Sequence, residues 1–375
     1  MRQKKLLFTP GPLSTSETVK QAMLRDLGSR DREFLSLVRD ILHRLLELGH
    51  VANGSYDAVL MQGPGTFAVE SVLSSVIPST GKLLVAINGS YGHRMAKIAK
   101  VLGIACETSV FDEATPVLTS RVREALADDP AITHLGIIHC ETSTGILNPV
   151  AELGRAVREF GRAFIVDGMS SFGGIPMDLA AEKIDFLISS ANKCIQGVPG
   201  FAFVLARRDL LQSAEGCARS VSLDLLAQSK GFESDGQFRF TPPTHALLAF
   251  RQALAELEEE GGVSGRAARY SANHKALMEG MTELGFDAYL GPEHQSHIIT
   301  SFRFPAHRRF DFSTFYERLS ESGFVIYPGK VSNADCFRIG TIGHIFPKDI
   351  RALVAAIGRV LAEMQVDSAH AISYA

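Results

Sequence analysis

The stretch "SSANKCIQGVPG", residues 189–200, places a lysine in a part of the chain that is otherwise apolar. The preceding "IDFLI" is typical of a buried strand, and the following "FAFVLA" is a second apolar run. The glycines and the proline between the two runs predict a turn. Lys193 therefore stands just beyond a strand end in a hydrophobic environment, where lysine is rare unless it has a function.

The composition is that of a globular protein with room for a large core. The chain has 375 residues, of which 46% are hydrophobic, and more than one domain of ~150 residues is usual at this length. The net charge is −3, with mixed signs and no long basic run. We therefore expect small-molecule ligands, and neither a nucleic acid nor a membrane surface as partner.

Targeting and redox signals are also missing. The apolar stretch near the N-terminus, "LLF", is shorter than the roughly 7–15 residues of a secretory signal, and no segment approaches the ~20 apolar residues of a membrane span. The five cysteines are scattered and show no CxxC spacing, so neither a metal site nor a disulfide framework is indicated. A reduced protein in the cytoplasm is expected.

From residue 56 to residue 206, short apolar runs alternate with helical patterns. The expected strands are "YDAVLMQG", "KLLVAING", "THLGIIHCE", "AFIVDGM", "IDFLISS" and "FAFVLA". Continuous runs of Val, Ile, Leu and Phe predict strands that are buried on both faces, and hence an α/β fold with a parallel or mixed sheet between layers of helices. Ligands bind to such a sheet at the carboxyl ends of its strands.

The pattern changes after residue 243 and predicts a smaller α+β unit. A strong helix, "TPPTHALLAFRQALAELEEE", is followed by a second helix over roughly 264–284 and a last helix from Pro347 to about Val366, with the strand-like runs "HIITSFRF", "FVIYPG" and "CFRIGT" between them. We place a large domain at residues 1–255 and a small C-terminal domain at 256–375. Residues 1 to about 15 are expected near the small domain.

The turn "GPGTF" lies between a predicted strand and a predicted helix. Free N–H groups and the positive end of a helix dipole suit a phosphate there, although an ordinary strand-to-helix turn has the same composition. Gly63-x-Gly65-x-x-Ala68 also fits the loose dinucleotide pattern, which needs an acidic residue about 20 positions further on to hold the ribose. The sequence has Asn88-Gly89-Ser90 at that place, which weakens the dinucleotide interpretation.

Asp167 and Lys193 end two further predicted strands. Taken singly, the aspartate could cap a turn and the lysine could extend to solvent from a strand end. Together with a phosphate-binding turn they match the needs of pyridoxal phosphate, which requires a lysine, an anion for the ring nitrogen and a phosphate cup. Burial would also help the lysine lose its proton and act as a nucleophile.

At this point the chain resembles the class V aminotransferases, which have the fold type I of pyridoxal-phosphate-dependent transferases. The resemblance rests on an ordered series of motifs: "LLFTPGPLSTS", "QGPGTFAVES", "INGSYGHR", "HCETSTGILNP", "IVDGMSSFGG", "SSANKCIQGVPGFAFV", "RFTPPTHALLAF" and "FRIGTIG". It implies a large domain with a mixed, mostly parallel, seven-stranded sheet, a smaller C-terminal α+β domain, and a homodimer with shared active sites.

The resemblance implies roles for five cofactor-binding residues of the large domain. Lys193 would bond to the aldehyde of pyridoxal phosphate and move the substrate proton, and Asp167 would pair with the ring nitrogen. Gly65 and Thr66 would bind the phosphate, where relatives can carry histidine in place of Thr66. Tyr91 would stack on the ring, where relatives often have tryptophan. The alternative for Tyr91 is a turn aromatic that packs over a helix start.

Four more residues receive roles from the resemblance. Thr142 would bond the ring hydroxyl, or else cap the next helix, and Asn192 would orient the cofactor. Thr241 would reach the phosphate bound by the other subunit of the dimer, or else cap its own following helix. Arg338 would hold the substrate carboxylate, and its alternative is a surface salt bridge on an edge strand.

Within the family, the chain is most similar to the branch that moves the amino group of 2-aminoethylphosphonate to pyruvate. Alanine–glyoxylate and serine–pyruvate transamination remain alternatives on the same fold. A cysteine desulfurase would need a mobile cysteine, whereas Cys336 lies in a predicted strand close to Arg338. From another class, a non-catalytic small-molecule binding protein is an alternative.

Overall fold

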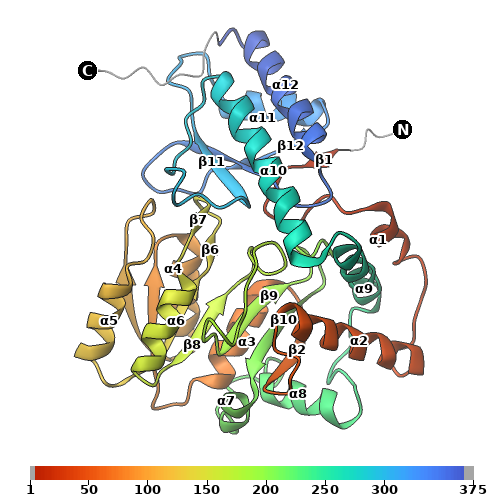
Figure 1. Cartoon of the computed structure of the whole chain (residues 1–375), viewed down its shortest axis with the longest axis vertical. Helices are drawn as coiled ribbons and strands as arrows, with labels where there is room; N and C mark the ends of the chain where they lie inside the picture. The colour runs from red at the N-terminus through yellow and green to blue at the C-terminus, as the bar shows by residue number, and fades with distance from the viewer. Residues whose placement is uncertain (1–4, 367–375) are drawn as a thin grey trace.

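The computed structural model describes residues 5–366 and is built around one large twisted sheet with helices on both faces (Figure 1). The sheet has seven strands in the order β2-β10-β9-β8-β5-β3-β4. Strand β10 is antiparallel to both of its neighbours, and the other pairings are parallel. The strands are β2 (Tyr56–Gln62), β3 (Lys82–Ile87), β4 (Ala105–Val110), β5 (Ile132–Ile138), β8 (Ala163–Asp167), β9 (Phe186–Ser190) and β10 (Phe201–Arg207).

The predicted α/β fold with a mixed, mostly parallel sheet is therefore confirmed. One strand, β4, has no counterpart among the apolar runs of the sequence. Its residues "ACETSV" are largely exposed because β4 is an edge strand with a single neighbour, β3. A strand that is not covered on both faces does not need a continuous apolar sequence, so hydrophobicity alone does not reveal it.

Two hydrophobic clusters lie on opposite faces of the sheet, as the alternation of side chains along a strand requires. In β10, Phe203 and Leu205 belong to one cluster, while Ala202 and Val204 belong to the other. The first cluster takes in helices α2 (Arg32–Leu48), α5 (Thr119–Asp128), α6 (Val150–Glu159) and α9 (Thr244–Glu259). The second takes in α3 (Gly65–Val76), α4 (Ser90–Val101), α7 (Arg208–Ser213) and α8 (Leu225–Ser234).

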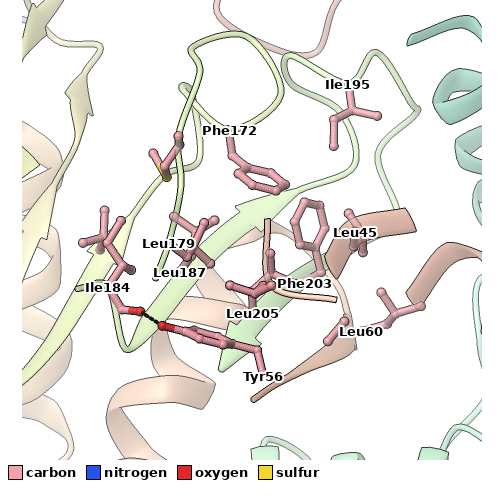
Figure 2. Packing of buried hydrophobic residues seen from close by; sticks show 14 of the residues in the cluster. Leu45, Tyr56, Leu60, Phe172, Leu179, Ile184, Leu187, Ile195, Phe203 and Leu205 are labelled. Atoms are coloured by element: carbon pink, nitrogen blue, oxygen red, sulfur yellow. Dashed lines mark hydrogen bonds between the residues drawn. The ribbon is translucent and has the colours of Figure 1, made fainter. Parts of the chain in front are cut away.

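Phe203 connects the sheet to the loop that follows β8. Figure 2 shows its ring near that of Phe172, with centroids 5.8 Å apart in an edge-to-face arrangement. The ring of Phe250, in α9, also lies near Phe203, with centroids 6.0 Å apart. In the same cluster the hydroxyl of Tyr56 donates a hydrogen bond of 2.7 Å to the carbonyl of Ile184 (Figure 2). Aromatic rings in contact with one another thus fill this part of the core, next to the sheet.

The C-terminal part of the chain forms a second, smaller unit with its own core. A three-stranded sheet, β11-β14-β13, packs with the helices around it. The elements are α10 (Gly262–Glu283), β11 (Ile299–Arg303), α11 (Phe312–Glu321), β12 (Phe324–Val325), β13 (Tyr327–Pro328), β14 (Cys336–Gly340) and α12 (Pro347–Glu363). In Figure 1, α10 runs from this unit down towards the large sheet.

The N-terminal segment crosses between the two units. Strand β1 (Leu6–Leu7) pairs in parallel with β12, and α1 (Glu17–Gln21) lies against α9. A short hairpin of β6 (Cys140–Glu141) and β7 (Ile146–Leu147) extends from the large unit towards β11 (Figure 1). Helix α9 spans residue 255, and the domain boundary near that residue stays a prediction. No helix within residues 5–366 is long and apolar enough to cross a membrane.

Replacing Phe203 with alanine should lower the free energy of unfolding by about 3–5 kcal/mol, because the change leaves a cavity in a core of fully buried rings. Denaturant unfolding followed by circular dichroism measures this. Val101→Ala is the matched control, since Val101 is 76% exposed at the end of α4 and should change stability by less than about 0.5 kcal/mol. A Phe203→Ala variant as stable as that control would contradict the packing described above.

Candidate active site

A cavity of about 560 Å³ opens where the parallel strands of the large sheet end. This is the place where ligands bind to such sheets, and the volume is within the usual range for ligand sites. Its lining comes from the segments that follow β2, β3, β5, β8 and β9. Of the residues predicted from the sequence, the cavity wall includes Gly65, Thr66, Tyr91, Thr142, Asp167, Asn192 and Lys193.

One end of the cavity is suited to an anion. Helix α3 begins at Gly65 without a side-chain cap, so its first N–H groups and its positive dipole face the cavity. Arg94 Nη1 lies 3.3 Å from Thr66 Oγ1 and adds a positive charge. A Cβ atom on Gly65 would come within 2.4 Å of Met169 Sδ, so any larger residue there would have to displace the Met169 side chain.

The sequence interpretation gave Arg94 no role, although the segment "INGSYGHR" was among the motifs. It stands three residues after Tyr91 on α4, a spacing that puts two side chains on one face of a helix. Its guanidinium lies 4.8 Å from the centre of the Tyr91 ring. The dinucleotide alternative finds no support, because Asn88, at the position of the ribose-binding acid, is engaged with Asn148 at 2.8 Å.

Asp167 ends β8 as a buried carboxylate without a counter-ion. Its Oδ1 accepts a hydrogen bond of 2.9 Å from the N–H of Met169, and no Lys, Arg or His nitrogen of residues 5–366 lies within 4.0 Å. Burial raises its pKa to about 6, and the nearby Glu141 carboxylate adds to the effect. A cation bound in the cavity beside Asp167 would offset the free-energy cost of burying the charged carboxylate.

Lys193 follows β9 and is enclosed by the N-terminal segment. Its Nζ donates a hydrogen bond of 3.0 Å to the carbonyl of Pro10, and burial lowers its pKa. Gly11 has a φ of +129°, and a Cβ atom there would lie 2.7 Å from Lys193 Cδ. The "TPGP" segment therefore needs glycine at this point to close over the lysine, and Pro12 completes the cavity wall.

The backbone next to Lys193 is held by helix α10. The carbonyl of Cys194 accepts hydrogen bonds from Arg266 Nη1 at 2.7 Å and from the Tyr270 hydroxyl at 3.0 Å. Gln196 has a positive φ of 69° and donates to the same hydroxyl at 2.7 Å. These residues position the lysine without touching the cavity, and sequence reasoning missed them because no local pattern connects α10 with this turn.

Tyr91 is oriented by a second buried carboxylate that sequence reasoning also missed. Glu141 Oε2 accepts the backbone N–H of Tyr91 at 3.0 Å and that of Gly92 at 3.3 Å, so it caps the start of α4. Burial raises the pKa of Glu141, while hydrogen bonds from Ser143 oppose the rise. A Cβ atom on Gly89 would lie 2.4 Å from Glu141 Cγ, which explains the glycine before α4.

Arg338 lies in β14, the central strand of the small sheet, and is only 3% exposed. Its Nη1 donates to the carbonyl of Thr142 at 2.7 Å, and its Nε donates to that of Pro328 at 2.9 Å. No carboxylate of residues 5–366 lies within 4.0 Å of the guanidinium. Burial lowers its pKa, and the adjacent Tyr91 opposes this. The alternative of a surface salt bridge on an edge strand is therefore wrong.

The two predicted threonines differ in their placement. Thr142 is buried at the cavity wall, whereas Thr241 is exposed and does not line the cavity of its own chain. Neither caps a following helix, because α6 and α9 begin after Pro149 and Pro243 without a side-chain cap. The carbonyl of Thr241 lies near Gln62 at the end of β2. Its predicted role across a dimer stays a prediction.

Comparison with known proteins places this geometry in a family. The family model for aminotransferase class V matches residues 47–332, which is more than half of the chain.

The chain belongs to the class V aminotransferase family.

A relative from Syntrophobacter fumaroxidans, named 2-aminoethylphosphonate–pyruvate transaminase, is 56% identical over 352 residues, covering 94% of this chain and 95% of that protein. A relative of the same name from Vibrio cholerae serotype O1 is 52% identical over 359 residues, covering 95% of this chain and 98% of its own length. Among solved structures, an alanine–glyoxylate aminotransferase from Nostoc sp. superposes with a TM-score of 0.89 at 25% identity, covering 96% of each chain.

Family membership confirms the fold and the enzyme class expected from the sequence: this class V aminotransferase carries the fold of pyridoxal-phosphate enzymes of fold type I. Membership of this family also explains why the protein keeps buried charges without counter-ions. Aminotransferases exchange charged amino and keto substrates, and a site for them needs fixed charges that the protein itself does not neutralise. Asp167 and Arg338 are such charges, and Lys193 interacts electrostatically with both of them and with Tyr91.

Asp167→Asn should stabilise the ligand-free protein at pH 8. Because burial moves the pKa of this carboxyl from 3.8 to about 6, the folded protein binds its proton more tightly than the unfolded chain, and stability falls as pH rises through that window. The gain from the substitution should be at most about 3 kcal/mol at pH 8, at ~1.4 kcal/mol per pKa unit, and should shrink at pH 5.

Denaturant unfolding at the two pH values measures the difference between wild type and variant. Asp128→Asn, at an exposed position at the end of α5, is the matched control for the loss of one carboxylate and should change stability by less than about 0.5 kcal/mol. Destabilisation by Asp167→Asn at pH 8 would show that the carboxylate is already paired within the ligand-free protein.

Proposed function

We propose that the protein transfers the amino group of 2-aminoethylphosphonate to pyruvate, giving phosphonoacetaldehyde and L-alanine, with pyridoxal phosphate as cofactor. The observation that carries the proposal is a set of three ionisable groups without counter-ions of their own: Asp167 and Lys193 line the cavity, and Arg338 is buried beside the cavity-lining Thr142. The names of the relatives at 52–56% identity over nearly the whole chain support this choice of substrates.

The residues at the cavity fit pyridoxal phosphate. The start of α3, with Thr66 and Arg94, suits the phosphate. Asp167, whose pKa is raised by burial, suits a protonated ring nitrogen. The hydroxyl of Ser190 is buried at the cavity wall and has no hydrogen-bond partner within the described chain, as expected of a group that meets a ligand.

When bound, the cofactor supplies an electron sink for the carbanion left when a substrate C–H proton departs. The chain supplies the rest of the chemistry. Lys193, whose pKa is lowered by burial, gives up its proton more readily than an exposed lysine, so its amine can bind an aldehyde and later carry a proton from one carbon to another. The hydrogen bond to the Pro10 carbonyl, and those that Arg266 and Tyr270 donate to the Cys194 carbonyl, keep its amine at the cavity wall.

Arg338 binds the phosphonate of 2-aminoethylphosphonate and, in the second half of the reaction, the carboxylate of pyruvate. Its guanidinium is already fixed by two backbone carbonyls and lacks a carboxylate partner, so an incoming anion meets a preorganised cation. Because Arg338 comes from the small unit and the Thr142 carbonyl from the large unit, anion binding depends on the contact between the two.

Among the alternatives, transamination between alanine or serine and glyoxylate or pyruvate would use the same groups. A cysteine desulfurase is disfavoured by the position of Cys336, which is buried in β14 with a pKa raised to about 11 by burial, and so is neither mobile nor reactive. A non-catalytic binding protein would have no need for an unpaired lysine and an unpaired aspartate at one cavity.

The purified holoenzyme, given pyruvate and a panel of amino donors, should form alanine fastest from 2-aminoethylphosphonate. A coupled assay of alanine formation, with serine and glycine as rival donors and glyoxylate as rival acceptor, makes the comparison. The specificity constant for 2-aminoethylphosphonate should exceed that of each rival at least tenfold. Faster turnover of serine, or of alanine with glyoxylate, would reassign the substrate within the same family.

We also propose a homodimer in which Thr241 meets the phosphate bound by the other subunit. Thr241 is exposed at the end of the long connection before α9 and stays outside its own cavity. Large apolar side chains near it and near the cavity mouth, Phe67 and Phe240, are 46% and 45% exposed, as suits a surface covered by another chain. The five free cysteines favour a reducing, cytoplasmic location.

A mixed dimer tests the shared site. Lys193→Ala removes the essential amine, and Thr241→Glu places a negative charge where the phosphate would lie, so each variant alone should be inactive. If Thr241 acts on the other subunit, a dimer of one chain of each kind has one site with both defects and one with neither. Mixing the two variants under subunit exchange should then restore up to half of the activity of a wild-type dimer. No recovery in verified mixed dimers would place Thr241 in its own chain's site.

A further inference from the structure

The proposed substrates differ in charge, although they occupy one site in turn. A phosphonate, like a phosphate ester, carries more than one negative charge near neutral pH, whereas the carboxylate of pyruvate carries a single one. Arg338 offers one positive charge. The phosphonate also lies one bond further from the amino nitrogen than the carboxylate of alanine does. A site for both should therefore hold a second cation, further from Lys193 than Arg338 is.

Lys330, in the loop between β13 and β14, is in the right place for this cation. Its Nζ lies 3.5 Å from the hydroxyl of Tyr91 and 4.7 Å from the centre of the ring. Arg338, eight residues further on, interacts with the same hydroxyl from the buried side. The two cations thus converge on one polar atom of the cavity wall, one from the interior and one from the exposed rim.

The loop that carries Lys330 is anchored to the large unit. The backbone N–H and the hydroxyl of Ser332 both donate to Glu113, at 2.8 and 3.0 Å, and the hydroxyl of Ser90 lies 3.5 Å from the carbonyl of Lys330. At the base of the loop, the N–H of Gly329 donates to the carbonyl of Cys336 at 2.9 Å. These contacts hold the backbone of the loop against the large unit, which keeps Lys330 within reach of Tyr91.

Lys330 also lacks a partner that would account for its position. Within residues 5–366 no carboxylate lies within 4.0 Å of its Nζ, and Glu113, which contacts the same loop, accepts two hydrogen bonds from Ser332. Contact with the Tyr91 ring alone would be worth little for an exposed ammonium group. A lysine that is tethered, unpaired and directed at the cavity rim is available to an incoming anion.

We propose that Lys330 is a specificity-determining residue that binds the phosphonate together with Arg338, and that it contributes little to pyruvate. The inference rests on the proposed function and names the part of the site that separates a phosphonate donor from carboxylate donors. Arg338 holds the anionic group of either substrate, and Lys330 adds the second charge that only the phosphonate needs.

Half-reactions of the holoenzyme test this directly. Lys330→Gln removes the charge and leaves a polar side chain that is slightly shorter, and Lys330→Arg keeps a positive charge on a long side chain. The rate of the first half-reaction with 2-aminoethylphosphonate and that of the second with pyruvate are followed separately by stopped-flow absorbance. Lys275→Gln, in the exposed face of α10, is the matched control for loss of one surface lysine.

Lys330→Gln should lower the second-order rate constant for 2-aminoethylphosphonate about tenfold, equivalent to ~1.4 kcal/mol, and that for pyruvate less than twofold. Lys330→Arg should recover most of the loss, and Lys275→Gln should change neither constant. Arg338→Ala should lower both constants, which separates a residue that serves both substrates from one that serves the phosphonate. An equal effect of Lys330→Gln on the two half-reactions, or no effect on either, would overturn the inference.

A binding measurement distinguishes failure of this inference from failure of the proposed function. Ethylphosphonate lacks an amino group and is not converted, so its dissociation constant can be measured by calorimetry on the holoenzyme. Lys330→Gln should weaken it about tenfold, while the dissociation constant of propionate should stay within a factor of two. If the wild type binds ethylphosphonate through Lys330 but does not convert 2-aminoethylphosphonate, the substrate assignment fails and the phosphonate site stands. Equal binding of ethylphosphonate to wild type and variant would show that Lys330 does not bind the phosphonate.

Discussion

The burial of charge without a counter-ion is the constraint on which the structure depends. Asp167 and Arg338 are buried, Lys193 is partly buried under the N-terminal segment, and none of the three meets an opposite charge within 4.0 Å in the described chain. Such an arrangement costs free energy in the ligand-free protein, as the displaced pKa values of all three show. It persists because a large hydrophobic core holds the strand ends in place, and it is useful because a ligand with matching charges repays the cost on binding.

The two units of the fold share the task of holding these groups. The large sheet delivers Asp167 and Lys193 at the ends of adjacent strands, β8 and β9. The small unit delivers Arg338 and, through α10, the hydrogen bonds that fix the Cys194 carbonyl beside the lysine. The N-terminal segment adds the Pro10 carbonyl. The active site is therefore a property of the contact between units, and a change that loosens this contact would disturb catalysis without touching the cavity.

Local electrostatics around Tyr91 link cofactor and substrate recognition. The pKa of this hydroxyl is lowered: burial alone would raise it, but Lys330, Lys193, a hydrogen bond with Thr142 and Arg338 together outweigh burial. Arg94 lies against the same ring and also reaches Thr66 at the anion-binding end of the cavity. An aromatic side chain held by Glu141 through the backbone can thus organise cations on several sides, which suits a site that must accept one anionic group of a cofactor and another of a substrate.

The sequence by itself determined the alternation of buried strands and helices, the glycine-rich turn before α3, and the placement of Asp167 and Lys193 at strand ends, because apolar periodicity and turn residues report on local exposure. It also carried enough ordered motifs to indicate the family. Only the tertiary structure decided which distant groups meet: Arg338 with the Thr142 carbonyl, Tyr270 with the Cys194 carbonyl, and the exposed edge strand β4 with β3. Such contacts arise from the packing of whole units against each other, and no local pattern of residues encodes them.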